Sequence, residues 1–157
     1  VGHLVECLAG DFRTVVPTIS EPVDVVTFIK VLHHFPDHDA MRVAVEAAWA
    51  ALRPGGRIVL FEPNGTSPMW PVVFAIRGRK VWSAERNTFL IHARFFDRVF
   101  GGLPGAQVTR GWRYLVPGTI ATRARALDRL DRKLVGIPGL RALSANVWYV
   151  VEKPMSA

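Results

Sequence analysis

A strand–helix–strand unit in the first half of the sequence limits the fold more than any other feature. Val23–Ile29 is a short apolar run rich in β-branched residues, which is typical of a strand buried on both faces. Residues 40–52 are mostly strong helix formers with apolar residues at helical spacing, and Asp37 or Asp39 can cap the helix start. A proline and two glycines then end the helix, and residues 57–61 form a second buried strand. The pattern predicts an α/β fold.

A helical crossover of this kind joins two parallel strands. In open α/β sheets, ligands bind outside the carboxyl ends of such strands. Here those ends are residues 28–34 and residues 61–64. We therefore expect the functional side chains of the chain in these two segments.

Three segments of the unit carry a resemblance to a known family. They are D-V-V-T-F-I-K-V-L-H-H-F at residues 24–35, A-L-R-P-G-G-R-I-V-L at residues 51–60 and F-E-P-N at residues 61–64. Together they resemble the fourth and fifth strands of class I S-adenosylmethionine-dependent methyltransferases of the type 11/12-like group, and the match covers residues 4–64. The resemblance implies a Rossmann-like methyltransferase sheet that is mostly parallel with an antiparallel end. An unrelated unit that ends in proline and glycine is the alternative.

The resemblance also implies which residues contact the cofactor, S-adenosyl-L-methionine. Asp11 stands where the family has an acid that hydrogen-bonds the adenine amino group, and Phe12 stands where a residue lies against the ring. A carboxylate can accept from an exocyclic amine, and an aromatic side chain can cover a purine face. A simple turn residue is the other interpretation of Asp11. The methionine end of the cofactor would be lined by Phe28, Lys30, His33 and His34.

The densest polar cluster consists of Lys30, His33, His34, Asp37, His38 and Asp39. Imidazole and carboxylate groups can bind zinc or iron. Adjacent histidines diverge in direction, however, and Asp37 or Asp39 is needed as a cap, so we predict no metal site. His34 is the candidate catalytic base, because histidine titrates near neutral pH, and a histidine that only caps or packs is the alternative. Glu62 and Asn64, where the second strand ends, are expected on the substrate side.

Two parts of the family pattern are absent ahead of these strands. The chain has neither the glycine-rich turn after the first family strand nor the acidic residue after the second. We therefore expect an N-terminally truncated domain that holds family strands 3 to 7 and lacks strands 1 and 2. Residues 4–8 would be its first strand, and Val23–Ile29 would lie at a sheet edge with unpaired backbone groups. Such a fragment is expected to aggregate in isolation.

Length and composition agree with a single partial domain over residues 1–157. Residues 1–64 would form the cofactor-side core, and residues 65–157 the lid-like insertions and closing strands. A chain of 157 residues with 50% apolar content can bury a core. No apolar run reaches spanning length, so we expect no integral membrane segment. The single cysteine, Cys7, excludes an internal disulfide and favours a reducing, cytoplasmic setting.

Charge is divided unevenly between the two halves. Residues 1–64 hold five basic and eight acidic side chains, a net charge of −3, whereas the remainder holds fifteen and five, a net charge of +10. Such a bias is typical of proteins that bind nucleic acid, an anionic membrane surface or an acidic substrate. A solvated surface in an arginine-rich proteome is a slightly better explanation of this charge bias, since arginine outnumbers lysine sixteen to four.

The second half predicts the elements that close the sheet. Residues 92–100 are expected to form a helix with a buried aromatic side, and residues 106–116 and 143–151 to form strands. Residues 120–134 indicate a helix with a basic face. This helix and residues 66–90 are the predicted lid. The helix could rest peripherally on an anionic membrane, or face the core with its charged side in water.

Three functions stay open on the sequence alone. The first is methyl transfer from S-adenosyl-L-methionine to a small molecule, and the tryptophan and phenylalanine side chains of residues 66–90 permit an apolar one. The second is an RNA-modifying relative, motivated by the +10 half. The third is a non-catalytic remnant or interaction module, motivated by the missing glycine-rich turn. The first is preferred, and the acceptor atom is not readable from the sequence.

Overall fold

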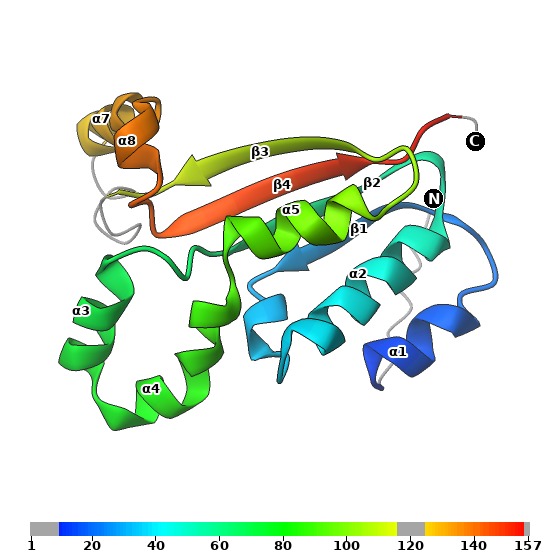
Figure 1. Cartoon of the computed structure of the whole chain (residues 1–157), viewed down its shortest axis with the longest axis horizontal. Helices are drawn as coiled ribbons and strands as arrows, with labels where there is room; N and C mark the ends of the chain where they lie inside the picture. Colours follow the sequence, from blue (N-terminus) through cyan, green and yellow to red (C-terminus); the bar gives the residue numbers. More distant parts are fainter. Residues whose placement is uncertain (1–9, 116–124, 156–157) are drawn as a thin grey trace, which may run out of the picture.

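A four-stranded sheet forms the centre of the molecule, with the strand order β1-β2-β4-β3 (Figure 1). The computed structural model describes residues 10–115 and 125–155. β1 (Val23–Ile29) and β2 (Leu52–Pro63) are parallel, whereas β4 (Asn146–Glu152) is antiparallel to both β2 and β3 (Gln107–Arg113). The predicted antiparallel end is confirmed. Among the described strands only the β1–β2 pair is parallel, and the strand predicted at residues 4–8 lies outside the described residues.

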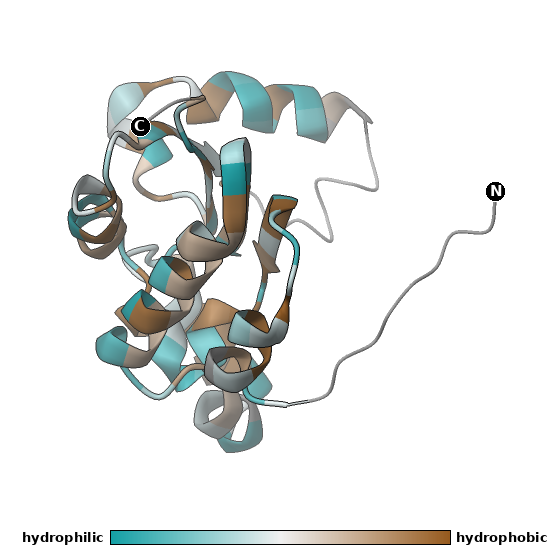
Figure 2. Cartoon of the chain, turned by 90° about the vertical axis from the view of Figure 1, so that its right-hand side faces the viewer, coloured by the Kyte–Doolittle hydropathy of each residue, from teal (hydrophilic) through white to brown (hydrophobic). Residues whose placement is uncertain are grey.

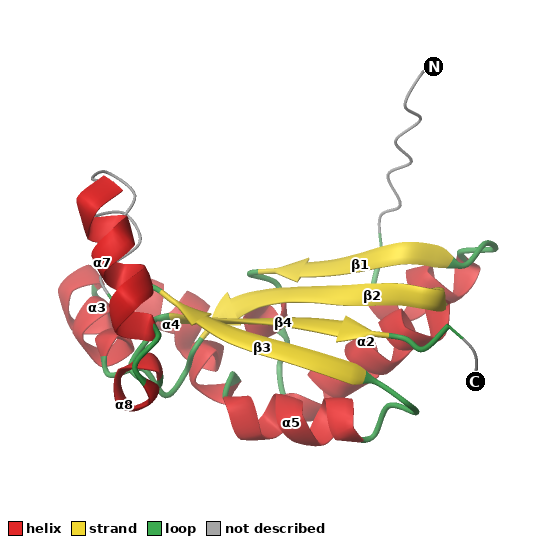
Figure 3. Ribbon diagram, turned by 90° about the horizontal axis from the view of Figure 1, so that it is seen from above, coloured by secondary structure: helices red, strands yellow, loops and turns green. Residues whose placement is uncertain are grey.

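Helices cover one face of the sheet and extend beyond the carboxyl ends of β1 and β2 (Figures 1 and 3). Most of them are short. They are α1 (Phe12–Val15), η1 (Val16–Thr18), η2 (Leu32–His34), α2 (His38–Ala51), α3 (Met69–Arg77), α4 (Arg79–Glu85), η3 (Arg86–Leu90), α5 (Ala93–Gly101), α7 (Arg125–Val135) and α8 (Pro138–Arg141).

The helix of the strand–helix–strand unit, α2, forms as its sequence predicts. Asp37 caps it, since the Asp37 side chain accepts a hydrogen bond from the amide of Ala40 at 2.8 Å. Met41, Val45 and Ala48 are buried against the sheet. These three residues share one face because their spacing follows the helical period.

Strand β2 begins at Leu52, directly after α2. From the sequence, its start was predicted later, at residue 57. The register explains the difference, because Val23 pairs with Leu52 whereas Val25 already pairs with Arg57. The intervening arginine, proline and two glycines therefore form a bulge within the strand. Gly55 has a φ of +74°, which glycine adopts at little cost. The sequence signal that ends the helix thus also starts the strand.

The core lies between the sheet and the helices α2 and α5. The side chains of α5 on this face are Phe95, Phe96, Val99 and Phe100, as predicted, and all four are buried. Tyr149 of β4 packs between Phe96 and Phe100, with ring centroids 5.2 Å from each. An aromatic layer therefore ties the closing strands to the helical face.

Helix α7 lies at the end of β3 and does not join this core. Figure 2 shows it along the top of the molecule with polar and apolar residues interspersed. Arg113 of β3 forms an ion pair with Asp128 at 2.8 Å, and buried Asp131 accepts from the amides of Tyr114 and Leu115 at 3.1 and 2.7 Å. Leu130 is exposed. Polar contacts therefore hold this helix. Among all the described helices, none is long and apolar enough to cross a membrane.

Strand β1 lies at the edge of the described sheet, as predicted. Val25 and Ile29 point away from α2 and are 46% and 58% exposed. Figure 3 shows the sheet face that no described helix covers. A strand with free backbone groups and exposed apolar side chains is a template for pairing with another chain.

We predict that Val25→Lys lowers self-association of the protein, because a charge on an edge strand opposes pairing. The free energy of unfolding should change by no more than about 0.5 kcal/mol, since Val25 is largely exposed. Sedimentation velocity across a concentration series measures the effect. The matched control is Val26→Lys, which should destabilise by roughly 2 kcal/mol or more, since Val26 packs against the core. Unchanged self-association of Val25→Lys would show that β1 is not the contact.

Candidate functional site

The chain turns sharply where β1 ends. Lys30 has a φ of +57°, a left-handed conformation that is uncommon for a residue with a side chain. Its amide still donates to the carbonyl of Phe61 at 2.9 Å, so the turn stays joined to β2. The helical turn η2 follows at once and carries His33 and His34. The strand end and both histidines are thereby brought to one edge of the sheet.

Glu62 of β2 holds this turn through hydrogen bonds to its carboxylate. Its side chain is fully buried, and its Oε1 accepts from the amides of Val31 and Leu32 at 2.7 and 2.8 Å. Its Oε2 lies 2.8 Å from Nδ1 of His33. A carboxylate accepts only, so His33 donates through Nδ1. Glu62, predicted on the substrate side, thus organises the backbone and His33.

Glu85 reaches the same place from the end of α4. Its Oε2 lies 3.1 Å from Nε2 of His33, which is 4% exposed, and the rings of His33 and His34 are 4.0 Å apart. The segment that carries Glu85 is attached to the loop before α2: Asn87 donates to the carbonyl of Phe35 at 2.9 Å. Nε2 of His38 also lies 2.7 Å from the carbonyl of Leu90. These polar contacts keep Glu85 above the two histidines.

Lys30 adds a cation to this end of the sheet. Its Nζ donates to the side-chain oxygen of Asn146 and lies 5.2 Å from the ring centroid of Phe61 and 5.9 Å from that of Trp70. Burial lowers the pKa of Lys30 to about 8, and the nearby carboxylates of Glu62 and Glu85 partly offset this effect. At pH 7 the group is therefore mostly an ammonium ion.

Three neighbouring cavities lie along these residues. The outer cavity, about 350 Å³, is lined by Asp11, Phe12, Lys30, Val31, His34, Phe35 and Pro36. The central cavity, about 310 Å³, shares Lys30 and His34 with it and adds His33, Glu85 and residues of α3. The lid cavity, about 510 Å³, shares Phe74 with the central one. The shared lining residues therefore place the central cavity next to each of the other two.

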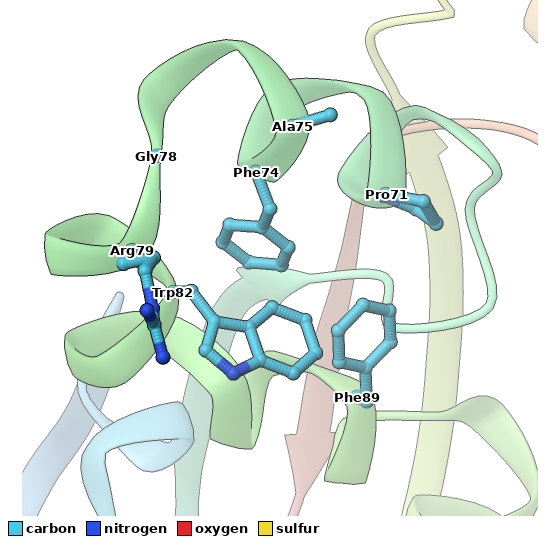
Figure 4. Close-up of a pocket in the computed structure, with 7 residues that line it drawn as sticks. All are labelled: Pro71, Phe74, Ala75, Gly78, Arg79, Trp82 and Phe89. Carbon is cyan, nitrogen blue, oxygen red and sulfur yellow. The ribbon is translucent and has the colours of Figure 1, made fainter.

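The lid cavity is apolar and lies between α3 and α4. Figure 4 shows the rings of Phe74, Trp82 and Phe89 gathered there, with Arg79 at the rim. Ring centroids lie 5.4 Å apart for Phe74 and Trp82, and 5.7 Å apart for Trp82 and Phe89. This is the usual spacing of aromatic pairs. Residues 66–90, which we predicted as lid, thus form a cavity of their own.

Most of the predicted site residues line these cavities, whereas Phe28, Glu62 and Asn64 do not. Asp11, Phe12, Lys30 and His34 line one cavity, and His33 lines the next. Phe28 is a buried core residue whose ring lies 5.4 Å from that of Phe12, so it supports Phe12 from below. Asn64 is also buried, and its amide donates to the carbonyls of Ala142 and Ser144 at 2.9 Å each. Asn64 therefore fixes the approach to β4.

Sequence reasoning missed Glu85 as a site residue. One signal could have marked it, because Glu85 is the only acidic residue between Asn64 and Asp97. An isolated carboxylate among aromatic and basic residues stands out as a candidate for a specific interaction. The contact with His33 itself depends on the path of α4 and was not predictable.

Comparison with known proteins identifies the fold. The family model described as a methyltransferase domain matches residues 1–60. The described residues have the α/β fold of class I S-adenosylmethionine-dependent methyltransferases, as the sequence predicted. No functionally curated protein matches the chain.

Solved structures with this methyltransferase fold share little sequence with the chain. An O-methyltransferase family protein from Burkholderia thailandensis is 13% identical with a TM-score of 0.61, over 97% of this chain and 36% of that one. A SAM-dependent methyltransferase from Archaeoglobus fulgidus is 12% identical, with a TM-score of 0.57, over 93% and 66%. The plantazolicin methyltransferase BamL, in complex with a triazolic desmethylPZN analog and SAH, is 12% identical, with a TM-score of 0.60, over 92% and 58%. The chain thus spans less than two thirds of the length of each.

We predict that Glu62→Ala destabilises the protein by about 3 kcal/mol, because the part-buried amide of Val31, the buried amide of Leu32 and the imidazole of His33 lose their acceptor. Glu62→Gln should cost only about 1 to 1.5 kcal/mol, since its carbonyl oxygen can still accept from the two amides. Urea unfolding followed by circular dichroism measures both values. Equal losses for the two variants would mean that the amide hydrogen bonds of Glu62 contribute little.

Proposed function

We propose that the protein transfers a methyl group from S-adenosyl-L-methionine to a small molecule with an apolar body. The observation that supports this function is the set of three neighbouring cavities. The outer cavity holds Asp11 and Phe12, the central cavity holds the polar groups of His33, His34 and Lys30, and the lid cavity is aromatic. A cofactor, a reacting atom and an apolar body can occupy these three spaces in order.

The outer cavity fits the adenosine part of the cofactor. The carboxylate of Asp11 can accept from an exocyclic amine, and the ring of Phe12, supported by Phe28, offers a flat apolar face for a purine. When bound, S-adenosyl-L-methionine supplies an electrophilic methyl group. The protein has then to hold the acceptor atom in line with it and to exclude water.

His34 is the residue that can accept a proton from the acceptor. It lines both the outer and the central cavity, so it borders the place where the two reactants meet. Its side chain is exposed, whereas His33 is buried and donates through Nδ1 to Glu62. An exposed imidazole at this border can take up a proton and release it to solvent.

The lid cavity favours an apolar body on the acceptor. Burying an aromatic or branched aliphatic group against Phe74, Trp82 and Phe89 stabilises the complex by about 25 cal/mol per Å² of apolar surface. Arg79 at the rim can pair with an anionic substituent. The acceptor we propose is therefore an aromatic or aliphatic small molecule.

We predict that the protein binds S-adenosylhomocysteine and that Asp11→Ala weakens binding roughly 5- to 30-fold, the loss of one charge-assisted hydrogen bond. Isothermal titration calorimetry measures the affinity. The matched control is Asp24→Ala, which removes an exposed aspartate paired with Arg53 near the start of β1. Its affinity should equal that of the wild type. Absence of any heat of binding for the wild type would leave only a non-catalytic remnant.

We predict that Trp82→Ala raises the KM of the preferred acceptor about 5- to 30-fold without changing the affinity for S-adenosylhomocysteine, because the lid cavity lies beyond the central one. The assay follows tritium from labelled S-adenosylmethionine into a panel of aromatic and aliphatic alcohols, amines and acids. Ile76→Ala is the control, since Ile76 on α3 is 80% exposed and lines none of the three cavities. Labelling of RNA but of no small molecule would contradict the proposed acceptor.

A further inference from the structure

The side chains of three residues, His33, His34 and Glu85, lie close together in the central cavity. One ligand atom from each lies within 4.8 Å of the others. From the sequence we predicted no metal site here, because adjacent histidines diverge in direction. The structure overcomes this difficulty with a third residue from a distant element, as Glu85 arrives from α4.

The hydrogen bonding of His33 leaves an unusual contact. Nδ1 donates to Glu62, so a neutral imidazole presents its lone pair at Nε2. Yet Nε2 lies 3.1 Å from Oε2 of Glu85, which also carries lone pairs. Two lone pairs at this distance repel each other. A positive species, either a proton or a metal ion, is therefore required between them.

We propose that His33, His34 and Glu85 bind a divalent transition-metal ion such as Zn²⁺. Two ligand atoms on one ion with bonds of about 2.0–2.2 Å lie roughly 3.0–3.5 Å apart. The separation of 3.1 Å between Nε2 of His33 and Oε2 of Glu85 falls in this range. Two imidazoles and one carboxylate are a common ligand set for such ions, and they leave a coordination position open.

Glu62 completes the arrangement from behind. Metal-binding histidines usually donate their other ring nitrogen to a carboxylate, which fixes the tautomer and raises the basicity of the ligand nitrogen. Glu62 does this for His33 at 2.8 Å, from a fully buried position. The carboxylates of Glu62 and Glu85 also offset the charge of an ion. Lys30 lines the same cavity, but its ammonium is bound by Asn146.

The bound ion deepens the proposed function and rests on it. The three ligand residues line the central cavity, where the acceptor atom is expected. With the ion bound, His34 would act as a ligand rather than as the base. An acceptor hydroxyl or carboxyl oxygen would be oriented by the ion, and a hydroxyl would release its proton to solvent. The acceptor class is accordingly narrowed to molecules with an oxygen at the reacting end.

Titration of the untagged protein with Co²⁺ tests the site. Cys7 is alkylated first, so that a thiolate cannot bind the ion. We expect one equivalent of Co²⁺ to give visible ligand-field absorption, and one equivalent of Zn²⁺ to abolish it. Glu85→Gln and His34→Gln should each weaken Co²⁺ at least about tenfold. Circular dichroism shows whether each variant keeps the wild-type fold.

The matched control is Glu46→Gln, because Glu46 is a half-exposed helical glutamate that pairs with Arg42 far from the cavity. It should bind Co²⁺ like the wild type. Absence of one-equivalent binding would overturn the proposal and leave a protonated His33 between two carboxylates. Equal affinity of Glu85→Gln would overturn it as well. Since S-adenosylhomocysteine is absent from this titration, its result is independent of the proposed methyl transfer.

Discussion

The carboxylate of Glu62 binds two amides and one imidazole that all belong to the turn after the neighbouring strand. The turn needs such a partner, because Lys30 leaves the strand in a left-handed conformation and the following amides lose their strand pairing. A buried amide without an acceptor costs about 1–3 kcal/mol, so one side chain satisfies groups that would otherwise oppose folding. The direction of His33 follows from the same contact. Glu62 thus joins the end of β1 to β2 and positions His33, which lines the central cavity.

Residues 66–90 are held together mainly by contacts between aromatic rings. Phe74, Trp82 and Phe89 come from three short elements whose sequences have little helical periodicity, and they pack mainly on one another. Short helices of this kind are marginal alone, so their position depends on a few polar attachments. Asn87 and His38 provide these, since they connect η3 to the loop before α2. A shift of this segment relative to α2 would separate Glu85 from His33.

Sequence patterns were most reliable where burial repeats at a regular period. Val23–Ile29 was predicted with its observed ends from a run of β-branched residues, and α5 to within one residue because its apolar side chains follow the helical period. The predicted burial of this strand on both faces was wrong, since Val25 and Ile29 are exposed. The boundary between α2 and β2 was less predictable. A proline and two glycines can end a helix by leaving regular structure or by entering a bulge, and only pairing with β1 distinguishes the two. Helix α7 shows a further limit, since its amphipathic pattern does not reveal that Asp131 and Asp128 hold it at the end of β3.

The sequence by itself determined the α/β class, the strand–helix–strand unit, the methyltransferase resemblance and the edge that carries Lys30, His33 and His34. These are properties of neighbouring residues, and local periodicity and spacing encode them. Only the tertiary structure decided the roles of Glu62 and Glu85. Glu62 looks like a residue leaving a strand, yet it is buried because β1 and β2 lie in parallel with their ends side by side. Glu85 meets His33 across 52 positions of sequence, through residues 66–90, which aromatic packing and polar contacts with a distant segment hold in place. Contacts between distant segments leave no periodic pattern in the sequence, so only the tertiary structure reveals the central cavity.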